Sequence, residues 1–441
     1  MKIKSMNYFL IITLLCVLCL NGCGEKPNNK GSVFYLNFKP EVNDIWAKIA
    51  ETYTAETGVE VKVLTAASGT YYKTLRAEIA KQEAPTLFQL DSPLSYEEWK
   101  YFCEDLSDTN LYAWLLDQSM AISTDEGVFG IPYVVEGYGI IYNDAIMQKY
   151  FNLPEKAVNI SSTKEINNYE TLKAVVKDMT VHKNELGIKG VFASTSFASG
   201  EEWRWNTHLL NLPIYYEFLD NNIVDTNNIQ FSYHSNFKNI LDLYTTYSIT
   251  DKTSLIKKTV NDSMLEFAKG EVAMVQNGNW AWSQIANIPE NTVTEENIKM
   301  LPIYTGVTGE ENQGLTIGTE SYFSVNAAAS EEDKKATIDF LEWLFSSDIG
   351  KDFVSNHLGF ISPFNTFSED ETPQDPLAQE VLASMSDTSK TSVSWNFTAF
   401  PSSIFKDSFG ASLLDYLEGK STWDTVVTQM KIDWAKAKGG Q

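Results

Sequence analysis

The sequence predicts an α/β protein with at least two domains. At 441 residues the chain is too long for a single hydrophobic core of ordinary size. From Val33 to Leu90, short β-rich runs alternate with amphipathic helical patterns, which indicates a parallel sheet covered by helices. Ligands of such sheets lie beyond the strand ends. A polar turn over residues 277–279, followed by two tryptophans, has the composition expected at such an edge.

The composition excludes some classes of partner. The formal net charge of −24 argues against nucleic acid or an anionic membrane surface, and it favours a neutral or cationic ligand. Hydrophobic residues make up 43% of the chain and aromatic residues 13%, as expected of a well-packed globular protein. Cys103 is the only cysteine after residue 23, so no internal disulfide is expected beyond the N-terminal segment.

The first 22 residues have the pattern of a signal peptide. Lys2 and Lys4 precede an apolar run over residues 9–20, which is too short to span a bilayer comfortably. The next residues, Leu20-Asn21-Gly22-Cys23, resemble a bacterial lipobox, and this resemblance implies cleavage after residue 22 and lipidation of Cys23. Residues 23–32 would then be the lipidated cysteine and a flexible tether. A single membrane-spanning anchor is the alternative.

Strands and helices alternate in the N-terminal part of the folded region. Strand patterns cover residues 33–38, 59–64 and 86–90, and helical patterns begin after Pro40 and cover residues 72–81. In a parallel sheet the loops around Lys39, Ser68 and Asp91 meet at one edge, where such folds bind ligands. For Lys39, Glu41 and Asp91, ordinary surface charge in loops is the alternative.

The remaining chain continues with helices and short strands. Helices are expected at residues 96–118, 168–182, 236–247, 262–269, 331–345, 405–417 and 423–437, and strands at 191–196, 300–304 and 315–325. The last of these is a strand pair that would return the chain to the first domain. Residues 197–206 form a Gly/Ser loop that leads into a helix and places Trp203 and Trp205 near its start. A helix packed by its own aromatic side chains is the alternative there.

The stretch from Phe267 to Trp282 reads FAKGEVAMVQNGNWAW. Phe267 completes the apolar face of a helix, and Lys269-Gly270 has the pattern of a helix end. A short strand follows, and residues 277–279 turn the chain directly before Trp280. An indole in this position can stack on the C–H face of a sugar ring. A core tryptophan beside an ordinary hairpin is the alternative.

This stretch resembles the signature of bacterial extracellular solute-binding proteins of ABC importers, especially the sugar-binding group that includes maltose-binding protein. Residues 129–143, 335–344 and 359–363 are also similar to segments of that family, so the resemblance extends over most of the chain. It implies a two-lobe periplasmic-binding-protein-like α/β fold with hinge crossings between the lobes. Lobe 1 would comprise residues 33–134 and 315–362, and lobe 2 residues 135–314 and 363–441.

The resemblance also implies the function. The protein would be a monomeric, lipid-anchored, extracytoplasmic receptor that captures a carbohydrate, expected to be an oligosaccharide, in the interlobe cleft and delivers it to the permease subunits. No metal or cofactor is expected. Glu136 stands where sugar-binding members place a Glu that bonds sugar hydroxyls, as a carboxylate can. A hinge salt bridge is the alternative for Glu136.

The candidate ligand residues fall into three groups. The expected stacking residues are Tyr71, Trp205, Trp280 and Trp395. The expected partners of sugar hydroxyls are Lys39, Glu41, Asp91, Glu136 and Asn279. Further candidates are Ser68, Tyr138, Trp203 and Asn206.

The sequence carries no convincing catalytic motif. Glu418-Gly419-Lys420-Ser421 has the end of a P-loop, but Leu414 stands where its first glycine belongs, and there is no G-x-S-x-G elbow. The four histidines lie far apart, without the spacing of metal ligands. Two other classes remain open. A receptor for a cationic solute such as a polyamine predicts a site dominated by acidic residues, and a secreted glycan-degrading enzyme predicts a carboxylate pair across the cleft.

Overall fold

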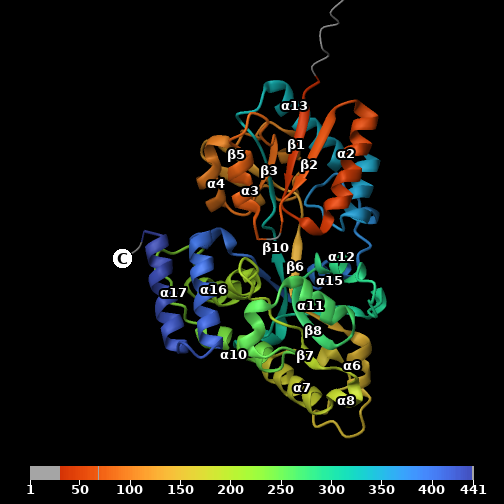
Figure 1. Cartoon of the computed structure of the whole chain (residues 1–441), viewed down its shortest axis with the longest axis vertical. Coiled ribbons are helices and arrows are strands. Elements are labelled where there is room, and N and C mark those ends of the chain that lie inside the picture. Colours follow the sequence, from red (N-terminus) through yellow and green to blue (C-terminus); the bar gives the residue numbers. More distant parts are fainter. Residues whose placement is uncertain (1–29, 68, 440–441) are drawn as a thin grey trace, which may run out of the picture.

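The computed structural model describes residues 30–67 and 69–439; Cys23, the expected signal peptide and Ser68 lie outside the described residues. The elements form two lobes that follow one another along the longest axis of the molecule (Figure 1). Each lobe is built on a mixed β-sheet with helices packed around it, which is the α/β class predicted from the sequence. No helix within the described ranges is both long and apolar enough to cross a membrane.

The first lobe contains a six-stranded sheet with the strand order β2-β1-β3-β11-β5-β4. Its strands are β1 (Ser32–Asn37), β2 (Glu60–Thr65), β3 (Leu87–Leu90), β4 (Ile122–Thr124), β5 (Gly127–Pro132) and β11 (Tyr322–Val325). β1 is parallel to β2 and β3, as predicted, whereas β11 is antiparallel to β3 and β5. Its helices include α2 (Asn43–Thr57), α3 (Tyr71–Glu78), α4 (Pro93–Trp99), α13 (Glu331–Ser346) and α14 (Asp348–Asp352).

The second lobe also contains a six-stranded sheet, with the order β12-β10-β6-β8-β7 and β9 paired to β6. Its strands are β6 (Glu136–Asn143), β7 (Gly190–Phe192), β8 (Val272–Gly278), β9 (Ile298–Leu301), β10 (Gln313–Gly318) and β12 (Thr391–Ser394). Its helices include α6 (Asp144–Phe151), α7 (Tyr169–Val181), α8 (Lys183–Leu186), α9 (Leu210–Asn221), α10 (His234–Thr246), α11 (Val260–Ala268), α12 (Ala281–Ala286), α15 (Pro376–Ser386), α16 (Ser403–Leu417) and α17 (Trp423–Ala437).

The signals at the helix ends act as the sequence suggests. Gly58 ends α2 in the left-handed conformation (φ +73°), and its N–H donates to the carbonyl of Thr54. A reciprocal capping box between Thr259 and Asp262 starts α11. Gly270, also left-handed at φ +67°, follows α11 and turns the chain into β8. These local signals fix where β8 starts and therefore where Trp280 lies.

The prediction of one helix over residues 96–118 is wrong. A capping box on Ser92 starts α4 early, and α4 ends at Trp99. Asp105 then binds the backbone N–H groups of Ser107 and Val128, which holds residues 104–108 in a loop against β5. Only a short helix, α5 (Asn110–Ala113), follows this loop. The local hydrogen bonds of Asp105 therefore outweigh the apolar helical pattern.

Two strand positions also differ from the expectation. β7 stops at Phe192, because the N–H of Ser194 donates to the carboxylate of Glu266 instead of continuing the strand. β10 and β11 are not a pair within one lobe. β10 pairs with β6 and β12 of the second sheet, so residues 315–318 lie with the second lobe. Phe364, placed in lobe 2 by the expected boundaries, packs in the core of the first lobe.

Candidate functional site

The ends of strands from both sheets converge where the chain crosses between the lobes. Glu136 opens β6 directly after the first crossing, and its antiparallel partner is Gly318, the last residue of β10. Glu320 lies in the short crossing from β10 to β11. Lys39 follows β1 of the first lobe, and Trp280 follows β8 of the second. We call the group formed there the interlobe site; it comprises Lys39, Glu41, Glu136, Trp203, His208, Trp280, Glu320 and Trp395.

A buried ion pair joins the first lobe to the first crossing. The ammonium Nζ of Lys39 lies 2.8 Å from Oε1 of Glu136, and the two residues are only 6% and 1% exposed. Burial opposes the charge of Lys39, but the attraction of Glu136, Tyr133 and Glu41 together outweighs it and raises the pKa of the ammonium. The other carboxylate oxygen of Glu136, Oε2, is buried and accepts no hydrogen bond from the described residues. The ion pair therefore leaves one buried acceptor without a donor among the described residues.

Aromatic side chains from separate parts of the second lobe surround His208. This residue lies in η5 (Arg204–Leu209), a π-helical turn, and is 1% exposed. Its ring centroid is 4.9 Å from that of Trp203, 5.3 Å from Trp280 and 5.9 Å from Trp395. Below them, the ring of Tyr138 stacks on the imidazole at 4.4 Å. The three indoles are only partly buried, unlike His208 and Tyr138, so part of each indole is exposed.

Two glycines allow two of these indoles to lie against the backbone. A Cβ atom on Gly278 would be 2.1–2.5 Å from atoms of the Trp280 ring. A Cβ atom on Gly318 would be 2.5–2.8 Å from atoms of Trp395. Each indole is thus held from one side by a strand end, and any side chain at these two positions would displace it.

Charge around the site is dense and only partly paired. Glu41 is partly buried beside Lys39, and burial raises the pKa of its carboxyl group. Nε2 of His208 lies 3.6 Å from Oε1 of Glu320, and burial lowers the pKa of the imidazole, which favours its neutral form. Nζ of Lys39 is 5.9 Å from the ring centroid of Trp280. These contacts connect both lobes and the second crossing.

Three of the predicted ligand residues are placed elsewhere. Tyr71 is 5% exposed in the core of the first lobe, where its hydroxyl bonds the backbone of Gln89. Trp205 is 2% exposed, stacks on Phe197 and donates its Nε1 proton to a backbone carbonyl. The amide of Asn206 donates to the carbonyl of Lys406. Their faces and polar groups are used internally, so the structure does not bring these three side chains into the interlobe site.

Other predicted residues lie near the site, but their polar groups are hydrogen-bonded within the protein. Tyr138 is fully buried and donates its hydroxyl proton to the carbonyl of His208 at 2.8 Å. Asn279 fixes the turn before Trp280, because its side-chain oxygen accepts the N–H of Gly137 at 3.0 Å. Asp91 is partly exposed at the end of β3, and its carboxylate accepts the hydroxyl proton of Ser92. Asp91 is thus at a strand end as predicted, but within the described part of the chain no contact joins it to the indoles of the interlobe site.

Sequence reasoning missed His208, Glu320 and Arg204. Arg204 is 2% exposed, and its guanidinium lies 4.4 Å from the ring centroid of Trp203. Its Nη1 donates to Ser196, whereas Nε and Nη2 bond no described residue. Burial lowers the pKa of this guanidinium to about 9. The sequence around these residues gives no local sign that they lie at the interlobe site. They reach it only through the assembly of the second sheet and the two crossings between the lobes.

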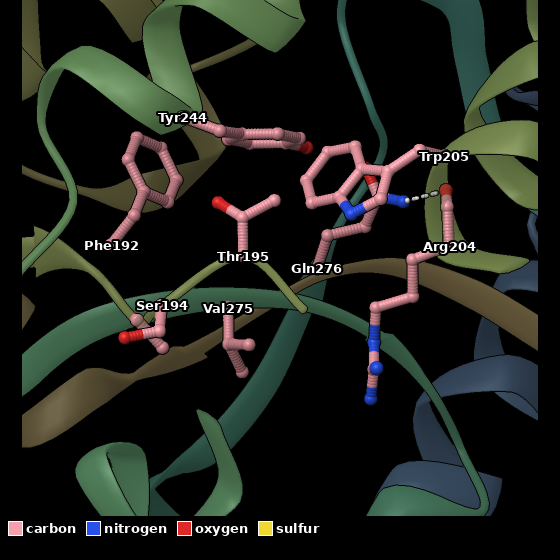
Figure 2. A pocket seen from close by; sticks show the side chains of 9 residues that line it. Phe192, Ser194, Thr195, Arg204, Trp205, Tyr244, Val275 and Gln276 are labelled. Carbon is pink, nitrogen blue, oxygen red and sulfur yellow. Dashed lines mark hydrogen bonds between the residues drawn. The ribbon is translucent and has the colours of Figure 1, made fainter. Parts of the chain in front are cut away.

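A separate small cavity lies inside the second lobe and is not the ligand site. Figure 2 shows Phe192, Tyr244 and Trp205 around Thr195, with Gln276 beside them. Gln276 donates to the backbone carbonyl of Arg204 at 3.0 Å. The cavity volume of about 10 Å³ is near the minimum for one water molecule and far below that of a sugar pocket. The interlobe site is therefore the better candidate.

The interlobe site combines apolar and polar surfaces. Its indoles offer apolar faces, and its carboxylates offer hydrogen-bond acceptors. Across the residues that the structure describes, no group of three or more His, Cys, Asp or Glu side chains could hold a metal ion.

Comparisons with known proteins agree with this architecture. Residues 48–380 match the sequence model of a family described as "Bacterial extracellular solute-binding protein". A comparison with curated protein sequences finds no match. Among solved structures, a chitin oligosaccharide binding protein superimposes with a TM-score of 0.73 at 14% identity, over 93% of this chain and 100% of that one.

Two further structures give similar results. RafE in complex with raffinose has a TM-score of 0.68 at 15% identity, covering 92% of this chain and 99% of that one. Maltose-bound MalE3 of T. maritima has a TM-score of 0.66 at 16% identity, covering 91% and 98%. At these identities the similarities establish the two-lobe fold and not the ligand.

Proposed function

Because the chain belongs to the family of bacterial extracellular solute-binding proteins, we propose that it captures a carbohydrate between its lobes and delivers it to the permease of an ABC importer. Proteins of this family bind a solute and do not convert it. A catalytic role for the carboxylates of the interlobe site is therefore not part of the proposal.

One observation carries the choice of a carbohydrate. Three partly buried indoles from distant segments, Trp203, Trp280 and Trp395, gather beside the buried pair of Lys39 and Glu136. Sugars combine apolar ring faces with hydroxyl groups in the ring plane, so they use both kinds of surface at once. Oε2 of Glu136 is already desolvated and unpaired, so a sugar hydroxyl that donates to it loses little to competition with water.

The structural neighbours support the same choice. One is a chitin oligosaccharide binding protein, one is in complex with raffinose and one is bound to maltose. Oligosaccharides are therefore the first ligands to test. Binding would favour the closed arrangement of the lobes, because residues of both lobes contribute to the interlobe site.

The mode of attachment is also a proposal. The lipobox-like residues Leu20-Asn21-Gly22-Cys23 support a chain that is cleaved before Cys23 and anchored through lipid on that cysteine. The lobes would then act as a monomeric receptor close to the permease.

The second candidate is a receptor for a cationic solute. Three carboxylates, those of Glu41, Glu136 and Glu320, lie around the ammonium of Lys39. A polyamine could neutralise them. Such a ligand makes no special use of flat indole faces beyond cation–π contact, which is why the carbohydrate is preferred.

A thermal-shift screen distinguishes the two candidates. Residues 24–441 are tested against mono- and oligosaccharides, polyamines and amino acids. A ligand at 100 times its dissociation constant stabilises the folded state by about 2.7 kcal/mol, which gives a clear shift. Trp280→Ala should weaken sugar binding about 30-fold, since truncation of a tryptophan at the centre of a site costs on the order of 2 kcal/mol.

Trp343→Ala is the matched control, because Trp343 is a partly buried indole that packs on Tyr53 in the first lobe, away from the site. It should leave affinity unchanged. A polyamine shift with no sugar shift would overturn the carbohydrate, and normal sugar affinity in Trp280→Ala would overturn the stacking role.

A further inference from the structure

We infer that His208 positions the three indoles of the interlobe site, those of Trp203, Trp280 and Trp395, and does so only while its imidazole is neutral. In this role His208 supports the indoles from behind and is not itself a ligand residue. The inference concerns the protein without a bound solute, so it goes beyond the proposed function and does not depend on which solute binds. It makes the arrangement of the site sensitive to pH.

The imidazole of His208 lies at the centre of the aromatic packing in the second lobe. On its faces, Tyr138 stacks at a centroid distance of 4.4 Å and an interplanar angle of 21°, and Phe397 at 5.6 Å and 28°. The planes of the three indoles meet the imidazole plane at 82°, 47° and 38°, in chain order. Five aromatic rings therefore pack around one imidazole.

The three indoles come from separate segments and share His208 as a neighbour. Trp203 precedes η5, Trp280 follows β8 and Trp395 follows β12. Each indole centroid lies within 5.9 Å of the imidazole centroid, whereas Trp203 and Trp280 are 6.1 Å from each other. Protein interiors are close-packed, so the loss of a central ring leaves a space into which its neighbours shift. The positions of the indoles thus depend on the imidazole.

The surroundings of His208 disfavour a charge on its ring. His208 is 1% exposed, and burial lowers the pKa of its imidazole. Two cations act in the same direction, Arg204 in the same helical turn and Lys406 in α16. The carboxylate of Glu320 acts in the opposite direction, but its Oε1 is 3.6 Å from Nε2, which is longer than a hydrogen bond. The neighbouring hydroxyl of Tyr138 stays uncharged, because burial raises its pKa.

Protonation of His208 would place a cation among buried rings, which costs free energy in this arrangement. Glu320 and the faces of the rings offset part of that cost. The packed arrangement therefore contributes stability above the ordinary imidazole pKa of about 6.5 and loses that contribution as the pH falls. Separation of the rings, which admits water to the imidazolium, relieves the cost. Acid thus weakens the positioning of the indoles.

An NMR titration of the solute-free protein tests the inference. Residues 24–441 are labelled in the indole N–H groups of tryptophan and in the imidazole rings of histidine, and the signals are assigned by single substitutions. Between pH 8 and pH 4.5, we expect His208 to titrate at a lower pH than the exposed His357 of η9 (Phe353–His357), and the three indole signals to shift with the midpoint of His208.

Three results of this titration would overturn the inference. They are a midpoint of His208 at or above that of His357, no titration of His208 in this range, and indole signals that stay fixed while His208 titrates. Because no solute is present, a failure to bind any saccharide would overturn the proposed function and leave this result unaffected.

Variants separate the packing of the imidazole from its charge. His208→Ala should shift all three indole signals at pH 7.5, because their support is lost. His208→Phe keeps a ring at this position, so it should bring the signals back toward their wild-type positions and remove their pH dependence. Unshifted signals in His208→Ala, or an unchanged pH dependence in His208→Phe, would show that His208 does not position the indoles. The signal of Trp343 in the first lobe is the control and should stay constant. If a variant does not fold, the titration of the wild type decides.

Discussion

The buried pair of Lys39 and Glu136 offers a quantitative test of the interlobe site. Both side chains are almost fully buried, and their charged atoms are 2.8 Å apart. Removing one partner of such a pair leaves a buried charge without compensation, which costs about 3–5 kcal/mol. Replacing both partners by apolar residues of similar size is close to neutral. Lys39→Met and Glu136→Leu should therefore each be strongly unfavourable alone and much less so together.

The pair joins the first lobe to a crossing, so the cost can appear in two ways. Either the free energy of unfolding falls, or the lobes separate and expose the remaining charge to water. Urea denaturation measures the first effect, and the radius of gyration from small-angle X-ray scattering measures the second. We expect a coupling energy of roughly 3 kcal/mol if the lobes stay together, or an increased radius in each single variant that the double variant does not show.

Additivity of the two single variants would refute this reasoning. Effects that add to within about 0.5 kcal/mol, with an unchanged radius of gyration in every variant, would mean that the two side chains do not interact in solution. The ion pair could then not position the carboxylate of Glu136 for a ligand.

Two further predictions concern the turn before Trp280 and the pH dependence of stability. Gly278→Ala should weaken sugar binding about tenfold or more, because its methyl group would overlap the Trp280 ring. Isothermal titration measures the affinity. Gly314→Ala is the control, since a Cβ atom at Gly314 would meet no atom closer than 3.3 Å. Asp375 accepts two backbone N–H groups at the start of α15, and burial raises its pKa from 3.8 to about 7. The folded chain therefore keeps a proton between about pH 4 and 7 that the unfolded chain has released, so this group stabilises less as pH rises through that window. Asp375→Asn removes this titrating group. The Tm of the variant minus the Tm of the wild type should therefore increase from pH 5 to pH 8. If that Tm difference is the same at both pH values, the raised pKa of Asp375 is wrong.

Much of the fold could be predicted because its signals are local. Pro40 and Gly58 bound the first helical pattern, Gly270 ends the pattern before β8, and alternation of strands and helices indicated the α/β class. The capping box that starts α11 at Val260 was not predicted, because the helix was expected to begin at residue 262. The helix expected over residues 96–118 failed because side-chain hydrogen bonds of Asp105, which depend on β5, decide the backbone there. The partner of β10 could not be predicted either, since a strand pattern does not show which sheet the strand joins.

The site could be predicted only in part for the same reason. Lys39, Glu136, Trp280 and Trp395 follow or open strands, and strand ends of both sheets meet between the lobes. The pattern of a helix start also does not show that the indole of Trp205 turns inward, where it is buried. His208 and Glu320 carried no signal in the sequence. They become site residues only when η5 packs on Tyr138 and when β10 leads into the second crossing.

A crystal structure of residues 24–441 with the tightest-binding saccharide would test the central claim most directly. The proposed function predicts a saccharide between the lobes, in contact with the indoles of Trp280 and Trp395 and with a hydroxyl bonded to Glu136. A saccharide bound outside the interlobe site, or held between the lobes without contact to either indole, would contradict it.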